Sequence, residues 1–292
     1  MATDSLQDIK RRIKSVTSTK HVTNAMKLVS TAKLRVAKNK FESTNENLIY
    51  VARHIAALFN FAENIPEKYI IENADATKTC YIVVTSSKGF CGGYNNNIIA
   101  KVEELIAESE KEAVILTIGS KGSDYFRNHK GVTVIGEYLE PPEDMQFAMC
   151  RELVAPVIRM FGEGEVDKVI LVYTAFENML SQTVKSEILL PFEIEDSTYL
   201  AGRKVHSVDV EFEPDTDAIF NYLVGKYFEI DLYANIIEAA TCEHTARRLA
   251  MESATDNAND MLDALSLNYN RARQAAITSE ITEIVAGTEV LK

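Results

Sequence analysis

Residues 9–38 read IKRRIKSVTSTKHVTNAMKLVSTAKLRVAK, and they contain neither glycine nor proline. The same is true of residues 1–65 as a whole and of residues 226–286 near the other end of the chain. Of the 12 glycines and 6 prolines, 16 lie between Pro66 and Pro214. Because these two residue types are the strongest helix breakers, we predict a long helix at each end of the chain and a turn-rich region between them.

The predicted helices are too long to fold inside an ordinary domain. A helix over residues 226–286 would span roughly 90 Å at about 1.5 Å per residue, whereas a domain of about 100–150 residues is only about 30 Å across. We therefore expect both helices to extend from the central region, most simply as an antiparallel pair. Two amphipathic helices folded back on a core would be the commoner arrangement, but it fits these lengths poorly.

Apolar residues mark the faces on which the two helices would pack. The N-terminal positions are Leu6, Ile9, Ile13 and Val16, followed after a longer step by Val22, Ala25, Val29, Ala32 and Val36. The C-terminal positions are Ala254, Ala258, Met261, Leu265, Tyr269, Ala272 and Ala276. Steps of three and four residues indicate a coiled coil. The longer step predicts a change of phase in the N-terminal stripe, and the C-terminal spacing predicts weak supercoiling.

The central region alternates between β-rich and amphipathic segments. We predict strands over residues 81–85, 113–118, 132–135, 168–174 and 183–189, and helices over residues 98–110, 124–129 and 143–160. Such alternation is typical of a mostly parallel sheet with crossover helices, and the short gap before the last strand indicates an antiparallel edge pair. The predicted fold class is α/β, with a Rossmann-like domain inserted between two long helices that form an antiparallel coiled coil. We place the N-terminal helix at 1–66, the α/β domain at 67–213 and the C-terminal helix at 214–292.

Composition argues against several classes of protein. The chain has 292 residues, of which 46% are hydrophobic, and a net charge of −12. No apolar run reaches the roughly 18 residues that a membrane-spanning helix needs, and residues 1–8 resemble no targeting signal. The four cysteines are scattered and form no C-x-x-C pair. We expect reduced thiols rather than a disulfide scaffold or a zinc ribbon.

The charge is unevenly distributed along the chain. Residues 1–40 hold ten Lys or Arg and two Asp, although the whole chain is acidic. Such an arm needs a partner or an acidic surface. The cations between Lys10 and Lys14 could contact nucleic-acid phosphates, but no aromatic residue interrupts the arm before Phe41. A protein partner is therefore favoured, and we expect no nucleic acid.

The segment most like an active site is residues 86–95, SSKGFCGGYN, between a predicted strand and a predicted helix. Phosphate-binding loops occupy such places, but the segment matches neither G-x-G-x-x-G nor G-x-x-x-x-G-K-[ST]. We favour a tight structural turn in which Gly89, Gly92 and Gly93 supply backbone freedom, with Cys91 as a buried thiol. A nucleotide site is the less favoured alternative.

The remaining polar residues suggest little further chemistry. The five histidines form no i, i+4 pair and no H-E-x-x-H motif, so no metal site is predicted. The Asp and Glu residues form no recognisable acid–base pair. We therefore expect no catalytic residue, no cofactor and no metal.

Three segments carry a resemblance to a known family. They are residues 9–38, quoted above, residues 250–258, AMESATDNA, and residues 269–287, YNRARQAAITSEITEIVAG. Together with the glycine-rich turn, they closely resemble the γ subunit of bacterial F-type ATP synthases in order and spacing over essentially the whole chain. One departure is that Ser87 and Lys88 stand where the family often has an acidic residue and an arginine.

The resemblance implies a central-stalk rotor. In this family the paired helices form a shaft inside a ring of three α and three β subunits, and the α/β domain is a foot near the ε subunit and the membrane c-ring. ATP is made or hydrolysed on β, so the chain would be a non-catalytic subunit, peripheral on the cytoplasmic side of the cell membrane. Coupling contacts with the stator ring are implied for Met26, Lys27, Arg273, Gln274, Thr278, Glu280 and Glu283.

Two other functions stay open on the residues alone. The chain could be a cytosolic coiled-coil adaptor with an α/β head, which would assemble with no such ring. It could also be a nucleotide-dependent enzyme that uses the turn at residues 88–95 and turns over substrate alone.

Overall fold

The computed structural model describes residues 6–61, 71–178, 181–191 and 216–290. The chain divides into two compact units. We call Met1–Thr31 with Arg247–Lys292 the helix-pair unit, and Ala32–Ala246 the α/β unit. The predicted domain boundaries near residues 66 and 213 lie outside the described residues.

A five-stranded sheet forms the centre of the α/β unit, in the order β3-β2-β1-β4-β5. Its strands are β1 (Lys78–Val84), β2 (Glu112–Ile118), β3 (Val132–Tyr138), β4 (Val166–Phe176) and β5 (Gln182–Leu190). β1 pairs in parallel with both β2 and β4, β2 pairs in parallel with β3, and β5 pairs antiparallel to β4. The predicted mostly parallel sheet with an antiparallel edge pair is confirmed.

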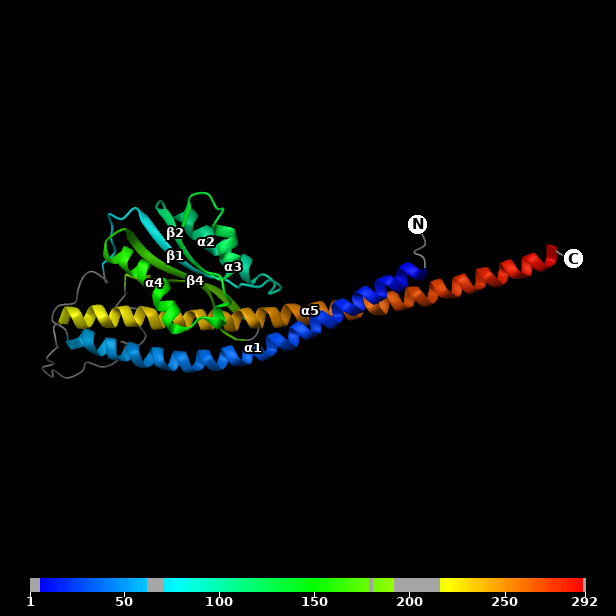
Figure 1. Ribbon diagram of the computed structural model, residues 1–292, viewed down its shortest axis with the longest axis horizontal. Coiled ribbons are helices and arrows are strands. Elements are labelled where there is room, and N and C mark those ends of the chain that lie inside the picture. The colour runs from blue at the N-terminus through cyan, green and yellow to red at the C-terminus, as the bar shows by residue number, and fades with distance from the viewer. Residues whose placement is uncertain (1–5, 62–70, 179–180, 192–215, 291–292) are drawn as a thin grey trace. The chain divides into compact units, whose positions relative to one another are not determined.

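Helices cover both faces of this sheet (Figure 1). On one face, α4 (Phe147–Gly162) and the early turns of α5 pack on strand residues such as Ile82 and Leu171. On the other, α2 (Tyr94–Glu108) and α3 (Ser120–Phe126) pack on residues such as Val83 and Ile115. The neighbours Ile82 and Val83 thus enter different cores, as the alternation of strand side chains requires. A short 3-10 turn, η2 (Pro142–Asp144), precedes α4, which begins four residues later than predicted.

Two long helices begin and end the fold. α1 runs from Leu6 to Phe61 and α5 from Thr216 to Val290, which confirms the prediction from the absence of breakers. α5 also continues through Gly225. One glycine in a helix interior costs only about 1 kcal/mol relative to alanine, so packing of the neighbouring turns outweighs it.

The buried stripe of α1 in the helix-pair unit differs from the predicted one. Ile9, Ile13 and Val16 are buried or half-buried as predicted, but Val22 and Val29 are 55% and 58% exposed. The stripe instead continues through Lys20, Thr23, Lys27 and Ser30. These positions keep an unbroken heptad spacing, so the predicted change of phase is wrong.

α5 shows the same kind of difference. Its buried and half-buried positions include Met251, Thr255, Ala258, Leu262, Leu265, Tyr269 and Ala272, again at heptad spacing. The predicted seam residues Met261, at 54% exposed, and Ala276 point outward instead. A sustained seven-residue repeat favours a left-handed supercoil, contrary to the weak supercoiling we predict from the alanine pattern.

Hydroxyl groups explain why polar residues lie in this seam. Thr23 and Thr255 are both buried, and the Thr255 hydroxyl donates to Thr23 Oγ1 at 2.8 Å. Each also lies within hydrogen-bond distance of a carbonyl of its own helix, Lys20 O and Met251 O. Because their hydrogen bonds are made inside the pair, these side chains can be buried without the penalty of an unsatisfied polar group.

Candidate functional site

The glycine-rich turn joins the end of β1 to the start of α2. Gly92 has a φ of +61°, which only glycine adopts without strain, and Phe90 has a φ of +63° and a 72% exposed side chain. Gly89 and Gly93 lie outside this left-handed region. A side chain at Gly93 would meet Asn97 at 3.4 Å, whereas one at Gly89 would meet nothing. Backbone freedom is therefore required at Gly92.

Polar groups in this turn bond to one another. Asn95 Oδ1 accepts from the Ser86 amide at 2.9 Å, and Asn95 Nδ2 donates to Ser86 Oγ at 2.7 Å. Cys91 is buried, with its sulfur 3.3 Å from Asn95 Nδ2. These donors are used inside the protein, which is the arrangement of a structural turn, and the predicted buried thiol is confirmed.

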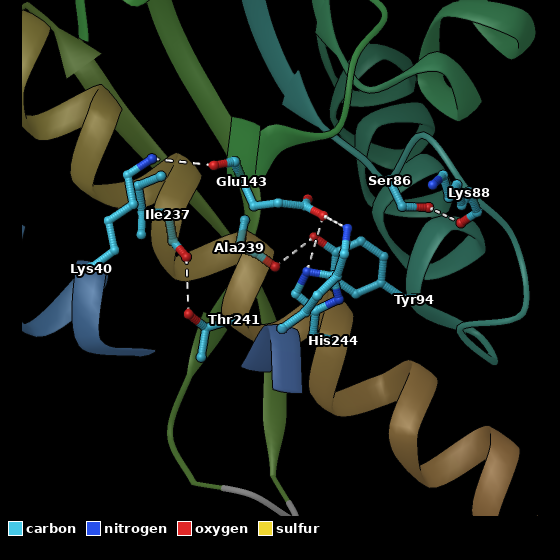
Figure 2. A network of polar contacts seen from close by, with 10 residues as sticks. Lys40, Ser86, Lys88, Tyr94, Glu143, Ile237, Ala239, Thr241 and His244 are labelled. Atoms are coloured by element: carbon cyan, nitrogen blue, oxygen red, sulfur yellow. Dashed lines mark hydrogen bonds and ion pairs between the residues drawn. The ribbon is translucent and has the colours of Figure 1, made fainter. Parts of the chain in front are cut away.

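The usual ligand crevice of a doubly wound sheet lies where the strand order reverses, here between β1 and β4. Tyr94 is 5% exposed at this point, and its hydroxyl donates to the carbonyl of Ala239 on α5 at 3.1 Å (Figure 2). Nearby, the Phe176 amide donates to Glu238 Oε1 at 2.8 Å. Burial raises the pKa of Tyr94 well above its usual range, so the phenol stays neutral. The protein fills this crevice with its own helix.

A buried carboxylate in the connection between β3 and α4 contacts both long helices. Lys33 Nζ of α1 lies 2.9 Å from Glu143 Oε1, and His244 Nε2 of α5 lies 3.2 Å from the same oxygen. Figure 2 shows the Glu143 side chain pointing toward His244. The Glu143 side chain is only 14% exposed.

Two partners determine the charge state of Glu143. Burial alone would raise the pKa of this carboxyl group, but the contacts with His244 and Lys33 outweigh it and lower the pKa to about 2. The hydrogen bond to Glu143 raises the pKa of Lys33. Both groups therefore stay ionised at neutral pH. Sequence reasoning missed this cluster because Glu143 is 110 residues from Lys33.

A second buried carboxylate lies on α5. Asp231 is 7% exposed, and Asn235 Nδ2 donates to its Oδ1 at a long 3.4 Å. Burial, with the nearby charges of Glu187 and Glu238, raises the pKa of Asp231 to about 8. Asp231 is therefore mostly protonated at neutral pH.

The residues predicted to contact a stator ring form two separate groups in the helix-pair unit. Met26 and Lys27 of α1 are half-buried, three and four residues from Thr23. Residues 273–285 of α5, which include Arg273, Gln274, Thr278, Glu280 and Glu283, are exposed throughout. Because Thr23 contacts Thr255, Arg273 lies about 27 Å further along α5 at about 1.5 Å per residue.

Other kinds of site find no support in the described parts of the chain. No group of three or more His, Cys, Asp or Glu side chains there could hold a metal ion. No helix among the described residues is long and apolar enough to cross a membrane. The four cysteines are free and buried.

Fold and site together define a class: a doubly wound α/β domain inserted between two long helices, one of which fills the domain's ligand crevice. The family model described as ATP synthase matches residues 5–291. The "ATP synthase gamma chain" of Alkaliphilus metalliredigens is 40% identical over 98% of this chain and 99% of that protein. The "ATP synthase gamma chain, sodium ion specific" of Acetobacterium woodii is 39% identical over 99% of both.

Solved structures have the same fold. A chain of the Euglena gracilis mitochondrial ATP synthase, in a structure of its OSCP, F1 and c-ring parts, matches with a TM-score of 0.69. That match covers 98% of this chain and 94% of the other at 17% identity. With the sequence relatives, these findings establish that the chain belongs to the ATP synthase γ chain family. It is the central-stalk subunit of an ATP synthase, and so part of an enzyme complex.

Proposed function

We propose that the chain is a rotor that turns inside an α3β3 ring and couples ion flow through the membrane sector to ATP synthesis or hydrolysis on β. The observation that carries this proposal is the exposure of the C-terminal part of α5, residues 273–285, which we call the bare end. Leu6, where α1 begins, lies 17 residues before Thr23, so the antiparallel position on α5 is Ala272. Beyond Ala272 every described side chain up to Val285 is exposed.

An exposed helix of this kind favours a surrounding partner. The bare end carries Ile277, Ile281, Ile284 and Val285, which are 49–61% exposed. A single helical segment of this length is marginal in water on its own, and a row of exposed apolar residues marks an interaction surface. The outward face of α1 adds Val22, Leu28 and Val29, each more than half exposed. A ring of subunits would cover both.

Rotation of the chain would be coupled to the states of the three β subunits because the helix pair is not symmetric. Met26 with Lys27 on one helix, and the charged residues after Ala272 on the other, present different chemistry to a ring with threefold repetition. A rotor whose faces bind the three β conformations with different free energies shifts the populations of those conformations when it turns. We therefore assign Met26, Lys27, Arg273, Gln274, Thr278, Glu280 and Glu283 to contacts with the α and β subunits.

We propose that the chain itself catalyses no reaction. The crevice that binds nucleotides in related folds holds Tyr94 and α5, and the turn beside it uses its donors internally. We infer a non-catalytic subunit without a cofactor, placed by its ε and c-ring partners at the cytoplasmic surface of the membrane.

Reconstitution tests the rotor against the adaptor and enzyme alternatives. The chain would be combined with the α and β subunits encoded in the same genome, and a probe on the α/β unit would be followed during ATP hydrolysis. We expect a stable complex in which the probe rotates in steps. An adaptor would form no ring complex, and an enzyme would bind ATP at submicromolar concentration by calorimetry without any partner.

A further inference from the structure

We propose that Glu143 is the positioning residue that fixes the angle between the sheet and those segments of α1 and α5 that belong to the α/β unit. This inference rests on the proposed rotor function, because torque applied to one part must reach the other through contacts inside the α/β unit. The contacts concerned all lie between residues 33 and 244, within that unit.

One oxygen atom of Glu143 joins the two helices. Oε1 lies 2.9 Å from Lys33 Nζ of α1 and 3.2 Å from His244 Nε2 of α5. The carboxylate belongs to the short connection that leaves β3, the edge strand of the sheet. The connection between β3 and α4, the first helix and the last helix therefore meet at this atom, and Figure 2 shows Glu143 beside His244.

The backbone of the same connection is held a second time. Lys40 Nζ donates to the carbonyls of Glu143 and Met145, at 3.2 Å each. It also lies 5.3 Å from the ring centre of Tyr233 on α5, and the Tyr233 hydroxyl donates to Met145 O at 3.4 Å. Lys33 and Lys40 are seven residues apart, so they lie two turns apart on one face of α1.

Burial and backbone restriction make this junction stiff. Glu143 and His244 expose only 14% and 2% of their side chains, whereas Lys33 is 43% exposed, so water is excluded mainly on the His244 side. Electrostatic contacts strengthen where water is excluded. Pro141 and Pro142 restrict the backbone immediately before Glu143, and the Asp144 amide donates to Pro141 O at 2.9 Å. The neighbouring charges of Asp144 and Glu243 also act on Lys33.

The directional character of these contacts distinguishes them from the apolar packing nearby. Phe228, Leu232 and Ile236 of α5 pack on the sheet through the larger hydrophobic core. Apolar contact holds surfaces together but has no preferred direction, whereas a hydrogen-bonded ion pair weakens steeply when its geometry changes. The core therefore keeps the helix attached, and Glu143 sets its angle.

Glu143→Gln tests the assignment in the assembled α3β3 complex. A bead would be attached through Glu110→Cys, since Glu110 is exposed and the native cysteines are all buried. The readout is the angular variance of the bead during a catalytic dwell. Because variance is inversely proportional to stiffness, we expect about a twofold increase with an unchanged rate of ATP hydrolysis.

Two controls separate positioning from stability. Glu140→Gln changes an exposed glutamate three residues away and should leave the variance unchanged. Asp167→Asn breaks a different ion pair of the domain, to Lys111 at 2.8 Å, whose two residues both lie outside α1 and α5. It should lower the melting temperature without broadening the angle. Equal broadening by Asp167→Asn and Glu143→Gln would overturn the assignment.

If the Glu143→Gln variant does not assemble, Lys33→Met tests the same assignment. It leaves the contact between Glu143 and His244 in place and should give a smaller broadening. Unchanged variance in Lys33→Met, or in an assembled Glu143→Gln complex, rejects the role of Glu143. Absence of rotation with the unaltered chain would instead reject the rotor function.

Discussion

The sheet core of the α/β unit and the seam of the helix-pair unit bury different chemistry. Around the sheet, fully buried residues are large and apolar, such as Phe161, Leu171 and Leu232. In the helix seam the buried positions include Thr23, Ser30, Thr255 and Ala258. Large side chains fill volume between layers, whereas small ones allow two helix backbones to approach closely. The sheet core should therefore be destabilised by lost side-chain volume. The helix seam should be destabilised by added volume and by lost hydrogen bonds.

The largest effect is expected from emptying the sheet core. Phe161 of α4 is 1% exposed and packs within the larger apolar cluster. Phe161→Ala removes a buried ring and leaves a cavity, so it should lower the free energy of unfolding by about 3–5 kcal/mol. Urea unfolding followed by circular dichroism measures this, with Phe90→Ala as the matched control at an exposed ring. A loss below that of the control would contradict the assigned core.

Overfilling the seam should have the next largest effect. Ala258 is 5% exposed in the helix-pair unit, and Ala258→Trp should push the helices apart at a cost of about 1–3 kcal/mol. Assembly yield with α and β subunits is the measurement. Asn257→Trp adds the same ring at an exposed neighbouring position and should cost little. Equal yields for the two variants would argue against a packed seam at Ala258.

Asp231 makes the α/β unit sensitive to pH. Its pKa is about 8 in the folded protein, against about 4 in an unfolded chain. The stability that depends on its proton is therefore present below pH 4 and is lost as the pH rises toward 8 and beyond. Asp231→Asn cannot ionise, so its free energy of unfolding in urea, relative to the unaltered chain, should rise by a few kcal/mol between pH 5 and pH 9. Asp144→Asn, at an exposed site, should show no such difference.

The hydroxyl pair of the seam should contribute less. Thr255→Val keeps the shape but removes the hydrogen bond to Thr23, which typically costs about 0.5–1.5 kcal/mol. Thr255→Ser keeps the hydroxyl and should recover part of the loss. The measurement is the melting temperature of each variant and of the unaltered chain. A more stable Val variant would mean that the seam gains nothing from its polar residues.

Met26→Lys should leave stability nearly unchanged and affect coupling. Met26 is half-buried beside the seam, and a further cation there would interact with acidic groups of a partner by about 1–4 kcal/mol, depending on the dielectric. We expect normal assembly and ATP hydrolysis but less ion pumping per ATP in reconstituted vesicles. Normal pumping in an assembled complex would reject the contact role, and failed assembly would place Met26 in the packing instead.

The sequence predicts the α/β domain well because its signals are local. The apolar run at residues 113–118 becomes a strand within one residue of the predicted ends, and the other strands agree within three residues. Glycine and proline separate them, and the missing breakers predict both long helices. Physical signals of this kind depend only on residues near one another in the chain.

The seam and the Glu143 cluster could not be predicted in the same way. Hydropathy alone assigns Val22 and Val29 to a buried face, yet the buried positions are Thr23 and Ser30. The Thr23 hydroxyl is acceptable inside because it is hydrogen-bonded, to Lys20 O of its own helix and to the Thr255 hydroxyl 232 residues away. The Glu143 cluster likewise depends on groups from three distant elements. Contact between distant residues, rather than composition, decides both.

The covering of the sheet by α5 has a consequence for how the protein is made. The first four strands, up to Phe176, leave the ribosome well before residues 228–239, which complete their apolar face. Side chains such as Val169 and Leu171 therefore have no cover from α5 until late in synthesis. Exposed apolar surface of this kind favours aggregation of partly made chains. During translation the nascent chain should therefore depend on chaperones until the last helix emerges.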